Sequence, residues 1–375
     1  MLIGVPAETE PAETRVAATP ETARRFVGLG AEVAIEHGAG ANAGFPDAEY
    51  QSAGARLVDA DQALGADLVL KVHPPSEVEL GFVKSGALVI AMMDPYGHRE
   101  AIEAMAKTGV AAFALELLPR ITRAQSMNVL SSQANLAGYR AVIDASNEYG
   151  RAMPMMMTPA GTVPAARLFV MGVGVAGLQA IATGRRLGAV VTATDVRPAT
   201  KEQVESLGAK FVAVEDEEFK QAETAGGYAK QMSDAYKAKQ AELMASHIAK
   251  QDIVVTTALI PGRPAPRLVS ADMVKSMRAG SVIVDLAVER GGNCELTRPG
   301  ELAFSGNGVK IVGYSNVTRI PASASALYAR NLYAFAETLI DKATNSLAVN
   351  WEDELVKATC LTRGGAIVHP NFMPQ

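Results

Sequence analysis

Short apolar runs alternate with segments of helical spacing along the first third of the chain. The apolar runs have strand length and lie at residues 2–5, 33–35, 68–72, 88–93 and 111–115, with helical segments between them at 46–53, 61–64 and 100–107. Thr19 and Pro20 open a further helix, because threonine caps a helix and proline fits its first position. Strands and helices in alternation predict a doubly wound parallel sheet.

The same alternation returns in the middle of the chain. Strand-like runs begin at residue 167 and continue at 189–194, 210–214, 252–256, 282–286 and 310–312. Two long helical patterns, at 127–149 and 324–338, have the length to leave the first domain and to return to it. We therefore predict an α/β protein with two doubly wound parallel-sheet domains joined by long helices. The first is discontinuous, with residues 1–126 and 328–375, and the second covers residues 127–327.

Two segments do not follow this alternation. A charged stretch at residues 215–250 is expected to be a flexible loop with helical flanks. Met155, Met156 and Met157 lie between prolines after the first long helix, and we expect them to fill a core or an interface, since methionine adapts to irregular gaps.

A glycine-rich stretch follows the first strand of the second domain. Gly172, Gly174 and Gly177 form the pattern Gly-x-Gly-x-x-Gly. In dinucleotide-binding proteins the first glycine makes a tight turn, the second lets the backbone approach the pyrophosphate, and the third lets the helix pack on the strand. The free N–H groups and the dipole of the helix N-terminus favour the anion. The pattern predicts a dinucleotide site, and the alternative is an ordinary tight turn.

Asp195 ends the next strand, about 20 residues after the glycines, where dinucleotide-binding proteins carry an acid. Its carboxylate can accept a hydrogen bond from a ribose 2′-hydroxyl and would repel a 2′-phosphate, which favours NAD over NADP. Arg197, two residues later, leaves NADP open. The alternative for Asp195 is a solvated loop aspartate.

Other polar residues follow predicted strands. Thr257, Ala258 and Leu259 come after one strand, and Asp285 ends another. The carboxyl ends of parallel strands line a ligand crevice, although turn chemistry and a helix cap explain these residues equally well. Arg15 and Lys71 also lie beside apolar runs, where they could meet a carboxylate or phosphate.

From sequence alone, we expect Arg15 and Lys71 to be surface cations.

The composition of the chain excludes several classes of function. The net charge of −5 over 375 residues, without a clustered basic face, gives no indication of a nucleic-acid partner. Two cysteines cannot build a disulfide framework, so a reducing compartment is expected. No apolar run approaches the roughly 20 residues of a membrane helix, and no signal peptide is recognisable, so the chain by itself is expected to be soluble. The histidines lack metal-ligand spacing, and we predict no metal site.

Residues 120–140, RITRAQSMNVLSSQANLAGYR, are more specific than a nucleotide fingerprint. They resemble the loop-and-helix signature of the NAD(H)-binding component, the alpha-1 subunit or domain I, of proton-translocating NAD(P)+ transhydrogenase, in the alanine dehydrogenase/transhydrogenase family. The resemblance continues through residues 154–158, 172–183, 225–230, 256–262, 285–289 and 364–370, and so covers essentially the whole chain.

The resemblance implies two Rossmann-like domains bridged by long helices and a homodimer formed through the nucleotide-binding domain. It also implies NAD(H) on this chain, NADP(H) on a separate partner component, and a further component that spans the membrane and moves the proton. The implied location is cytoplasmic, peripheral to the inner face of the membrane.

Carried over position by position, the resemblance implies roles at the site. Arg120 is similar to a loop arginine beside the NAD nicotinamide and phosphate, Gln125 to a glutamine that reaches the NADP(H) component, and Ser131 to a serine near the carboxamide. Tyr228 is similar to the tyrosine of a mobile loop that closes over the nucleotide. From the residues alone, the preferred interpretations are a surface salt bridge, a helix-cap network and an ordinary exposed tyrosine.

The candidate site thus has two sets of residues. The candidate catalytic residues are Arg120, Gln125, Asn128 and Ser131. The candidate cofactor-binding residues are Gly172, Gly174, Val175, Gly177, Asp195, Val196, Arg197, Gly227, Tyr228, Thr257, Ala258 and Leu259.

Asn128 departs from the family, which has an aspartate at this position. Asparagine keeps an acceptor, gains donors and loses the negative charge. We expect hydride transfer to survive, because the two nicotinamides carry the chemistry and the protein supplies their placement.

Two other functions remain open. Alanine dehydrogenase resembles the same family in fold and has equivalents of Arg15, Lys71 and Asp285, but it uses a histidine as acid and base where this chain has Met92. Methionine cannot move a proton, and His98 lies several residues away in an expected loop. A module that senses NAD without catalysis is the second alternative, and the partner-facing loop with Gln125 argues against it.

Overall fold

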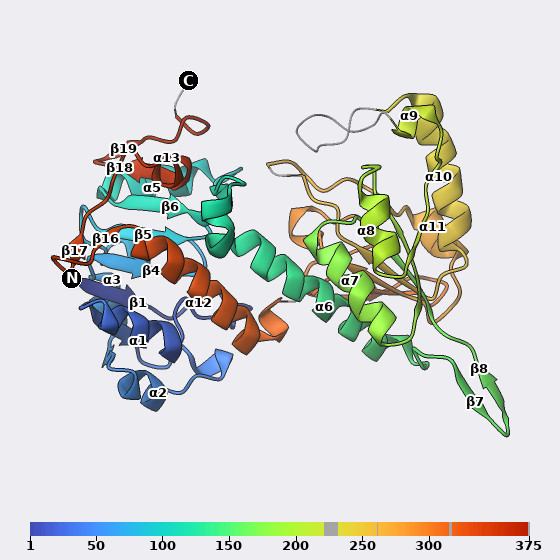
Figure 1. The fold of residues 1–375 in the computed structure, drawn as a ribbon, viewed down its shortest axis with the longest axis horizontal. Helices are drawn as coiled ribbons and strands as arrows, with labels where there is room; N and C mark the ends of the chain where they lie inside the picture. Colours follow the sequence, from blue (N-terminus) through green and yellow to red (C-terminus); the bar gives the residue numbers. More distant parts are fainter. Residues whose placement is uncertain (221–231, 261, 315–316, 374–375) are drawn as a thin grey trace. The chain divides into compact units, whose positions relative to one another are not determined.

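The computed structural model describes residues 1–220, 232–260, 262–314 and 317–373. The chain divides into two compact units: the first is Met1–Gln133 with Val317–Gln375, and the second is Ala134–Asn316 (Figure 1). The second unit is therefore inserted in the sequence of the first. Helix α6 (Val129–Tyr149) begins in the first unit and continues into the second.

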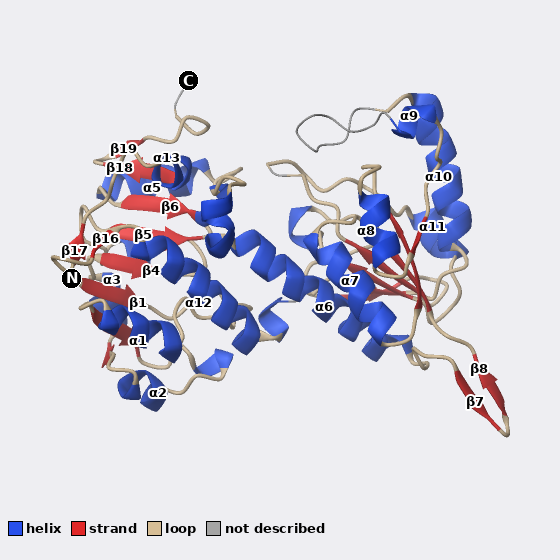
Figure 2. Cartoon of the chain, viewed as in Figure 1, coloured by secondary structure: helices blue, strands red, loops and turns tan. Residues whose placement is uncertain are grey.

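The first unit is built on a sheet of eight strands among the described residues, in the order β19-β18-β6-β5-β4-β1-β2-β3 (Figure 2). Strands β1 to β6 are parallel, whereas β18 runs antiparallel to β6, and β19 antiparallel to β18. The strands are β1 (Leu2–Val5), β2 (Glu32–Glu36), β3 (Arg56–Val58), β4 (Leu68–Leu70), β5 (Leu88–Ala91), β6 (Ala111–Ala114), β18 (Cys360–Arg363) and β19 (Ala366–Ile367).

Helices cover both faces of this sheet. Ile90 packs with α1, α12 and α13 on one face, while its neighbours Val89 and Ala91 pack with α3, α4 and α5 on the other. Thr19 caps α1 as expected, through a capping box with Thr22. The helices are α1 (Pro20–Gly28), α2 (Asp47–Ser52), α3 (Ala60–Leu64), α4 (Glu77–Leu80), α5 (Arg99–Thr108), α12 (Pro321–Glu337) and α13 (Glu354–Thr359).

The second unit repeats the same order of parallel strands. Its described sheet has seven strands in the order β11-β10-β9-β12-β13-β15-β14, of which β14 is antiparallel. When only the six parallel strands are numbered along the chain, this order is 3-2-1-4-5-6, the order of dinucleotide-binding sheets, and β14 is an added edge strand. The strands are β9 (Arg167–Met171), β10 (Val190–Thr194), β11 (Lys210–Phe211), β12 (Ile253–Thr256), β13 (Val282–Asp285), β14 (Leu302–Phe304) and β15 (Lys310–Val312).

Helices again lie on both faces of the second sheet. Val170 packs with α6, α7 and α8, and its neighbour Phe169 packs with α10 and α11. These helices are α7 (Val175–Arg186), α8 (Thr200–Ser206), α10 (Asp234–Ile248) and α11 (Ala271–Ser276), and a short helix, α9 (Glu217–Lys220), precedes α10. The predicted α/β class with two doubly wound sheets is confirmed, apart from the antiparallel edge strands.

Two small hairpins complete the described strands. Strands β16 (Ile340–Asp341) and β17 (Ser346–Leu347) pair in the first unit, and β7 (Met156–Thr158) pairs with β8 (Gly161–Val163) in the second. Of the two positions expected for the methionines, the core is wrong, because Met155 is 61% exposed and Met157 on β7 is 78% exposed, and the interface stays a prediction. No described helix has both the length and the apolar character needed to cross a membrane.

Candidate functional site

The loop between β9 and α7 has the geometry expected of a phosphate-binding turn. Gly172 has φ +104°, and a Cβ atom there would lie 2.5 Å from Thr257 Oγ1. A Cβ atom on Gly177 would lie 1.9 Å from the Gly172 carbonyl oxygen, so this glycine lets α7 pack on the loop. Gly174 is the N-cap of α7 and would bring its Cβ near no other atom. The backbone at Gly174 is therefore open to an approaching anion, on the first turn of a helix.

Helix α6 packs against the same turn. A Cβ atom on Gly138 would lie 2.0 Å from the carbonyl oxygen of Ala176, which only a glycine avoids. The glycine within the long helical pattern thus marks a close helix–helix approach. This contact fixes α6 against the first turn of α7.

Asp195 directly follows β10 and is joined to the glycine loop. Its Oδ2 accepts a 2.7 Å hydrogen bond from the Val173 N–H, and its Oδ1 accepts hydrogen bonds of 2.9 Å from both the backbone N–H and Nε of Arg197. Arg197 also donates to the Val173 carbonyl oxygen at 3.1 Å. The side chain of Asp195 is 6% exposed, and Val196 beside it is 61% exposed. The predicted selector acid is thus held in place by the loop and by Arg197.

The segment after β12 closes the other side of the loop. Thr257 donates its backbone N–H to the Met171 carbonyl oxygen and its hydroxyl to the Gly172 carbonyl oxygen, both at 2.9 Å. Asn293 clamps Ala258, donating to its carbonyl oxygen at 2.8 Å and accepting from its N–H at 3.0 Å. Leu259 is 53% exposed. Asn293 is missed by sequence reasoning, because no local signal distinguishes it from an ordinary loop asparagine.

The structure brings together those predicted cofactor residues of the second unit that it describes. Met171, Thr194 and Thr256 end neighbouring strands in register, so the loops after β9, β10 and β12 share one sheet edge. Gly227 and Tyr228 lie outside the described residues. Asp285 ends β13 and is fully buried, with its carboxylate accepting from Thr256, Ala287, Cys294 and Thr297. Its partners give it a structural role in positioning the turn after β13.

The four candidate catalytic residues lie in the first unit. Arg120 comes shortly before a 3-10 helix, Thr122–Met127, and Gln125 lies in it; both side chains are exposed. The segment is held down by Arg123, which forms an ion pair with Asp353, and by Asn331, which donates to the Ser126 carbonyl oxygen at 2.7 Å. The loop thus presents exposed polar side chains from a fixed backbone.

Asn128 is the N-cap of α6. Its Oδ1 accepts a 2.9 Å hydrogen bond from the Ser131 N–H, and its backbone has the extended conformation of a capping residue. Asparagine and aspartate are both good N-caps. The structure therefore contains the helix cap that the residues alone predict for Asn128 and Ser131. This cap is compatible with a role of either side chain at a nucleotide.

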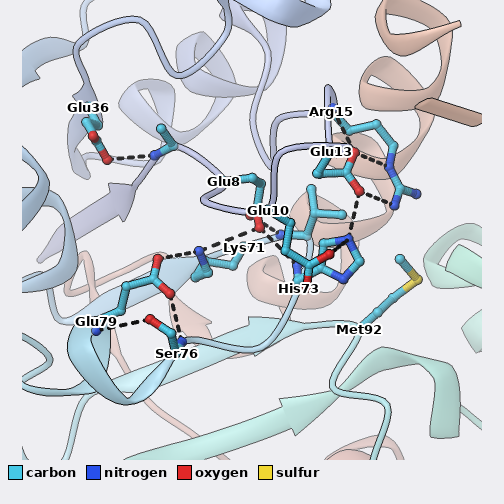
Figure 3. A network of polar contacts seen from close by, with 12 residues as sticks. Glu8, Glu10, Glu13, Arg15, Glu36, Lys71, His73, Ser76, Glu79 and Met92 are labelled. Carbon is cyan, nitrogen blue, oxygen red and sulfur yellow. Dashed lines mark hydrogen bonds and ion pairs between the residues drawn. The ribbon is translucent and has the colours of Figure 1, made fainter. Parts of the chain in front are cut away.

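A buried polar network occupies the corresponding strand ends of the first unit (Figure 3). Arg15 pairs with Glu13 at 2.7 Å, and the two side chains are 5% and 2% exposed. His73 contacts the same carboxylate at 2.7 Å, and Arg15 also donates to Gln133 Oε1 at 3.0 Å. Burial alone would raise the pKa of Glu13, but the hydrogen bonds from Arg15 and His73 outweigh it and hold the pKa far below its usual range.

Lys71 lies deeper in the same network. Its Nζ is 2.7 Å from Glu79 Oε1 and 3.6 Å from Glu8 Oε2, and the side chain is 1% exposed. Burial raises the pKa of Glu8, against the opposing charge of Lys71. The expectation of surface cations at Arg15 and Lys71 is therefore wrong, because internal carboxylates neutralise both and allow their burial. The acids near the N-terminus were the only sequence signal for this.

Glu116 is a further, partly buried acid that sequence reasoning missed. Its Oε1 accepts hydrogen bonds from the N–H groups of Met93 at 2.8 Å and Asp94 at 2.5 Å, whereas its Oε2 is buried without a partner among the described residues. Burial raises the pKa of Glu116 to about 7. Asp94 has the left-handed φ of +44°, so Glu116 holds a strained backbone segment beside Met92. In the described ranges, no group of three or more His, Cys, Asp or Glu side chains is placed to hold a metal ion.

Comparison with known proteins assigns the chain to a family. The model for the N-terminal domain of alanine dehydrogenase/PNT matches residues 4–137, and the model for the C-terminal domain of alanine dehydrogenase/PNT matches residues 141–370. The chain belongs to the alanine dehydrogenase/PNT family. The two matched domains together span almost the entire chain.

The family contains similar proteins of two kinds. The chain is 55% identical to the first of the parts that form the NAD(P) transhydrogenase subunit alpha of Rhodospirillum rubrum, and the alignment covers 100% of both. It is 31% identical to alanine dehydrogenase 1 of Staphylococcus aureus, with 80% of this chain and 76% of the other covered. Within the family the chain is of the NAD(P) transhydrogenase subunit type, as residues 120–140 predicted.

Solved structures give the same result. A transhydrogenase from Sinorhizobium meliloti is 60% identical and superposes with a TM-score of 0.90, covering 98% of this chain and 100% of that one. An L-alanine dehydrogenase is 26% identical with a TM-score of 0.83, covering 99% and 98%. Both family branches therefore share this fold, and residues rather than topology separate them.

Proposed function

We propose that this chain is the NAD(H)-binding component of a proton-translocating transhydrogenase. The observation that carries the proposal is an open glycine loop, with an acid at the next strand end, in a chain that matches a transhydrogenase subunit along its full length. The bound nicotinamide supplies the hydride chemistry, with direct transfer to or from NADP(H) on a partner subunit. The protein supplies placement.

The nucleotide is proposed to lie in the domain of residues 127–327. The N–H groups of the first turn of α7, at Gly174, Val175 and Gly177, would hold the pyrophosphate. Thr257, Ala258 and Leu259 would line the site from the next loop. Tyr228 and Gly227 are proposed to belong to the loop that closes over the nucleotide.

Asp195 is proposed to select NAD over NADP by accepting from the ribose 2′-hydroxyl, with Val196 and Arg197 beside it. Its position is supported by the 2.7 Å bond from the Val173 N–H. Asp195→Ala is expected to weaken NADH binding by at least about tenfold, the effect of one hydrogen bond to a charged group. Arg197→Ala is the matched control for loss of the ion pair. Unchanged NADH affinity in Asp195→Ala would contradict the assignment.

Arg120, Gln125, Asn128 and Ser131 are proposed to set the junction with the NADP(H) component. Support comes from their exposure or partial exposure on a loop that is fixed from below. Since donor and acceptor carbons must approach to about 3–3.5 Å, the dihydronicotinamide has to stay open on one face. An exposed polar loop meets that requirement.

The proposed partners are the NADP(H)-binding component, a membrane-spanning component that carries the proton step, and a second copy of this chain. The β7–β8 hairpin supports the homodimer, because Met157 is 78% and Val163 37% exposed on a two-stranded arm that is marginal alone. The proposed location is cytoplasmic, at the inner face of the membrane.

Reconstitution with the NADP(H)-binding component tests the proposal. We expect NADH-to-NADP+ hydride transfer that requires both proteins. The same chain mixed with NADH, pyruvate and ammonia should show no appreciable turnover, because Met92 cannot act as a proton donor. Turnover with pyruvate would instead establish an alanine dehydrogenase, and NADH binding without transfer would establish a sensing module.

A further inference from the structure

A separate cavity lies at the opposite, amino edge of the first sheet. It has a volume of about 580 Å³ and is lined where β5 and β6 begin, at Leu88 and Ala111. Because β18 runs antiparallel to β6, its last residue, Arg363, comes to the same edge. Figure 1 shows β18 and β19 beside β6 and α5. The cavity is therefore far along the strands from the polar network of Figure 3.

The charged side chains that line this cavity are all positive. Its lining contains two ionisable side chains, Lys107 and Arg363, and no carboxylate. Neither cation has an ion pair within the described part of the chain. The acid near Arg363 is Glu352, which is itself paired with Lys357 at 2.6 Å. Two cations on one concave surface without a paired counter-ion create a positive potential that an anion would neutralise.

Arg363 is held in place by aromatic stacking. Its guanidinium carbon lies 4.5 Å from the centroid of the Trp351 ring, and Trp351 stacks in turn on Phe113 with an interplanar angle of 15°. Phe113 is fully buried. Stacking through the face of a guanidinium leaves its N–H groups, which lie in the guanidinium plane, available for hydrogen bonds. The cation is thus oriented before any ligand arrives.

The rim of the cavity consists of small residues. Gly364 and Gly365 connect β18 to β19 with φ values of +58° and +83°, and Gly86 and Gly109 also have positive φ. A Cβ atom on Gly364 or Gly365 would meet no atom within 4 Å, so the two-residue turn leaves the backbone open at the entrance. Ser85 adds a hydroxyl group to the lining. Volume, charge and donors fit a small ligand.

We propose that this cavity binds a small phosphate-type oxyanion, either inorganic phosphate or a phosphate monoester, through Lys107 and Arg363. Planar forked donors and a lysine charge are the groups that recognise phosphate oxygens. The site is separate from the proposed NAD(H) site, because none of its lining residues is among the candidate cofactor-binding or catalytic residues.

The sole tryptophan of the chain, Trp351, reports on this site. Inorganic phosphate and glycerol phosphate are titrated into the full chain, with sodium chloride at matched ionic strength, and followed by tryptophan fluorescence and calorimetry. Saturable binding of either anion above the chloride response is expected. A response equal to that of chloride with both anions would overturn the proposal.

Variants assign the binding to the cavity. Lys107→Ala and Arg363→Ala are each expected to weaken binding by about tenfold or more, the effect of a charge-assisted hydrogen bond. Lys342→Ala, which removes an exposed lysine paired with Glu337, is the control and should change affinity less than about twofold. If Arg363→Ala fails to fold, the exposed Lys107 still decides the question. Equal affinity in Lys107→Ala and wild type, or loss of binding when NADH is present, would sink the assignment.

Discussion

The two units have the same strand order but differ at the point where such sheets take a ligand. Sheets of order 3-2-1-4-5-6 bind ligands beyond the first and fourth strands, where the order reverses. In the second unit this position, after β9 and β12, has glycines and the small side chain of Thr257. In the first unit, the segments after β1 and β4 carry Glu13, Lys71 and His73.

The difference shows that topology fixes where a site can be, whereas side chains decide whether it is open. The glycines of the second unit expose backbone N–H groups to an anion from outside. The carboxylates of the first unit neutralise its own cations from inside, with Glu13 on Arg15 and both Glu8 and Glu79 facing Lys71. A cation that would recognise a substrate carboxylate is thus already paired in the first unit.

Breaking the internal pairing should have the largest effect. Lys71→Met leaves Glu8 and Glu79 buried without a counter-charge and is expected to lower the free energy of unfolding by about 3–5 kcal/mol. NADH affinity should stay within about twofold, because the residues proposed to hold the pyrophosphate and the ribose lie in the other unit. Chemical denaturation and an NADH titration measure the two quantities. Lys84→Met, at an exposed pair with Asp67, is the control and should cost less than about 1 kcal/mol.

Closing the glycine loop of the second unit should instead weaken NADH binding. Gly177→Ala places a Cβ 1.9 Å from a backbone oxygen that no rotamer change can relieve, so we expect at least about hundredfold weaker NADH binding, equivalent to about 3 kcal/mol. Gly174→Ala is its matched partner, since a Cβ there meets nothing in the chain. Any weaker NADH binding by Gly174→Ala would therefore come from contact of the added methyl group with the nucleotide alone. Wild-type affinity in Gly177→Ala would contradict the comparison.

Glu116 gives the first unit a further pH dependence. Its folded-state pKa is raised from 4.5 to about 7, so the folded chain holds this proton more tightly than the unfolded chain. The contribution to stability is full below about pH 4.5 and is lost as the pH rises through about 7, by up to about 3 kcal/mol. Glu116→Gln should remove this slope. The free energy of unfolding is measured for wild type and Glu116→Gln from pH 4.5 to 8. The same pH dependence in both proteins would show that Glu116 is not the cause.

The smallest expected effect separates capping from charge at Asn128. Asn128→Ala loses the bond to the Ser131 N–H and should lower stability by about 1 kcal/mol, whereas Asn128→Asp keeps a good N-cap and should lose little. Thermal unfolding measures this. In the reconstituted assay, Asn128→Asp should leave hydride transfer within about tenfold of wild type, since placement by the cap is unchanged. A gain of several orders of magnitude would show that the missing carboxylate is catalytic.

Much of the fold could be predicted because its signals are local. Every parallel strand but β3 (Arg56–Val58) begins or ends close to a recognisable apolar run, and Thr19 with Pro20 marks the start of α1 correctly. The glycine spacing located the turn after β9, and residues 120–140 identified the family. The short antiparallel additions were missed, since strands of two to four residues carry little periodicity.

The first-unit network could not be predicted, because its members are far apart in the sequence. Glu13 and His73 are 60 residues apart, and Arg15 and Gln133 are 118 apart. Each taken singly is a charged or polar residue that normally faces water. Glu116 also lies among apolar neighbours in the sequence without a visible partner, so only the folded positions of β5 and β6 show that its Oε2 atom is buried.

The insertion of one unit within the sequence of the other has a consequence for synthesis on the ribosome. The second unit is contiguous and holds all strands of its sheet, so it can fold as soon as residue 316 has emerged. The sheet of the first unit keeps β6 as a bare edge until β18 (Cys360–Arg363) is made, and Tyr328, which donates its hydroxyl to the Lys71 carbonyl oxygen, arrives equally late. An unpaired strand edge is prone to aggregation during that interval. The half-made first unit is therefore the region of the nascent chain that chaperones would have to protect.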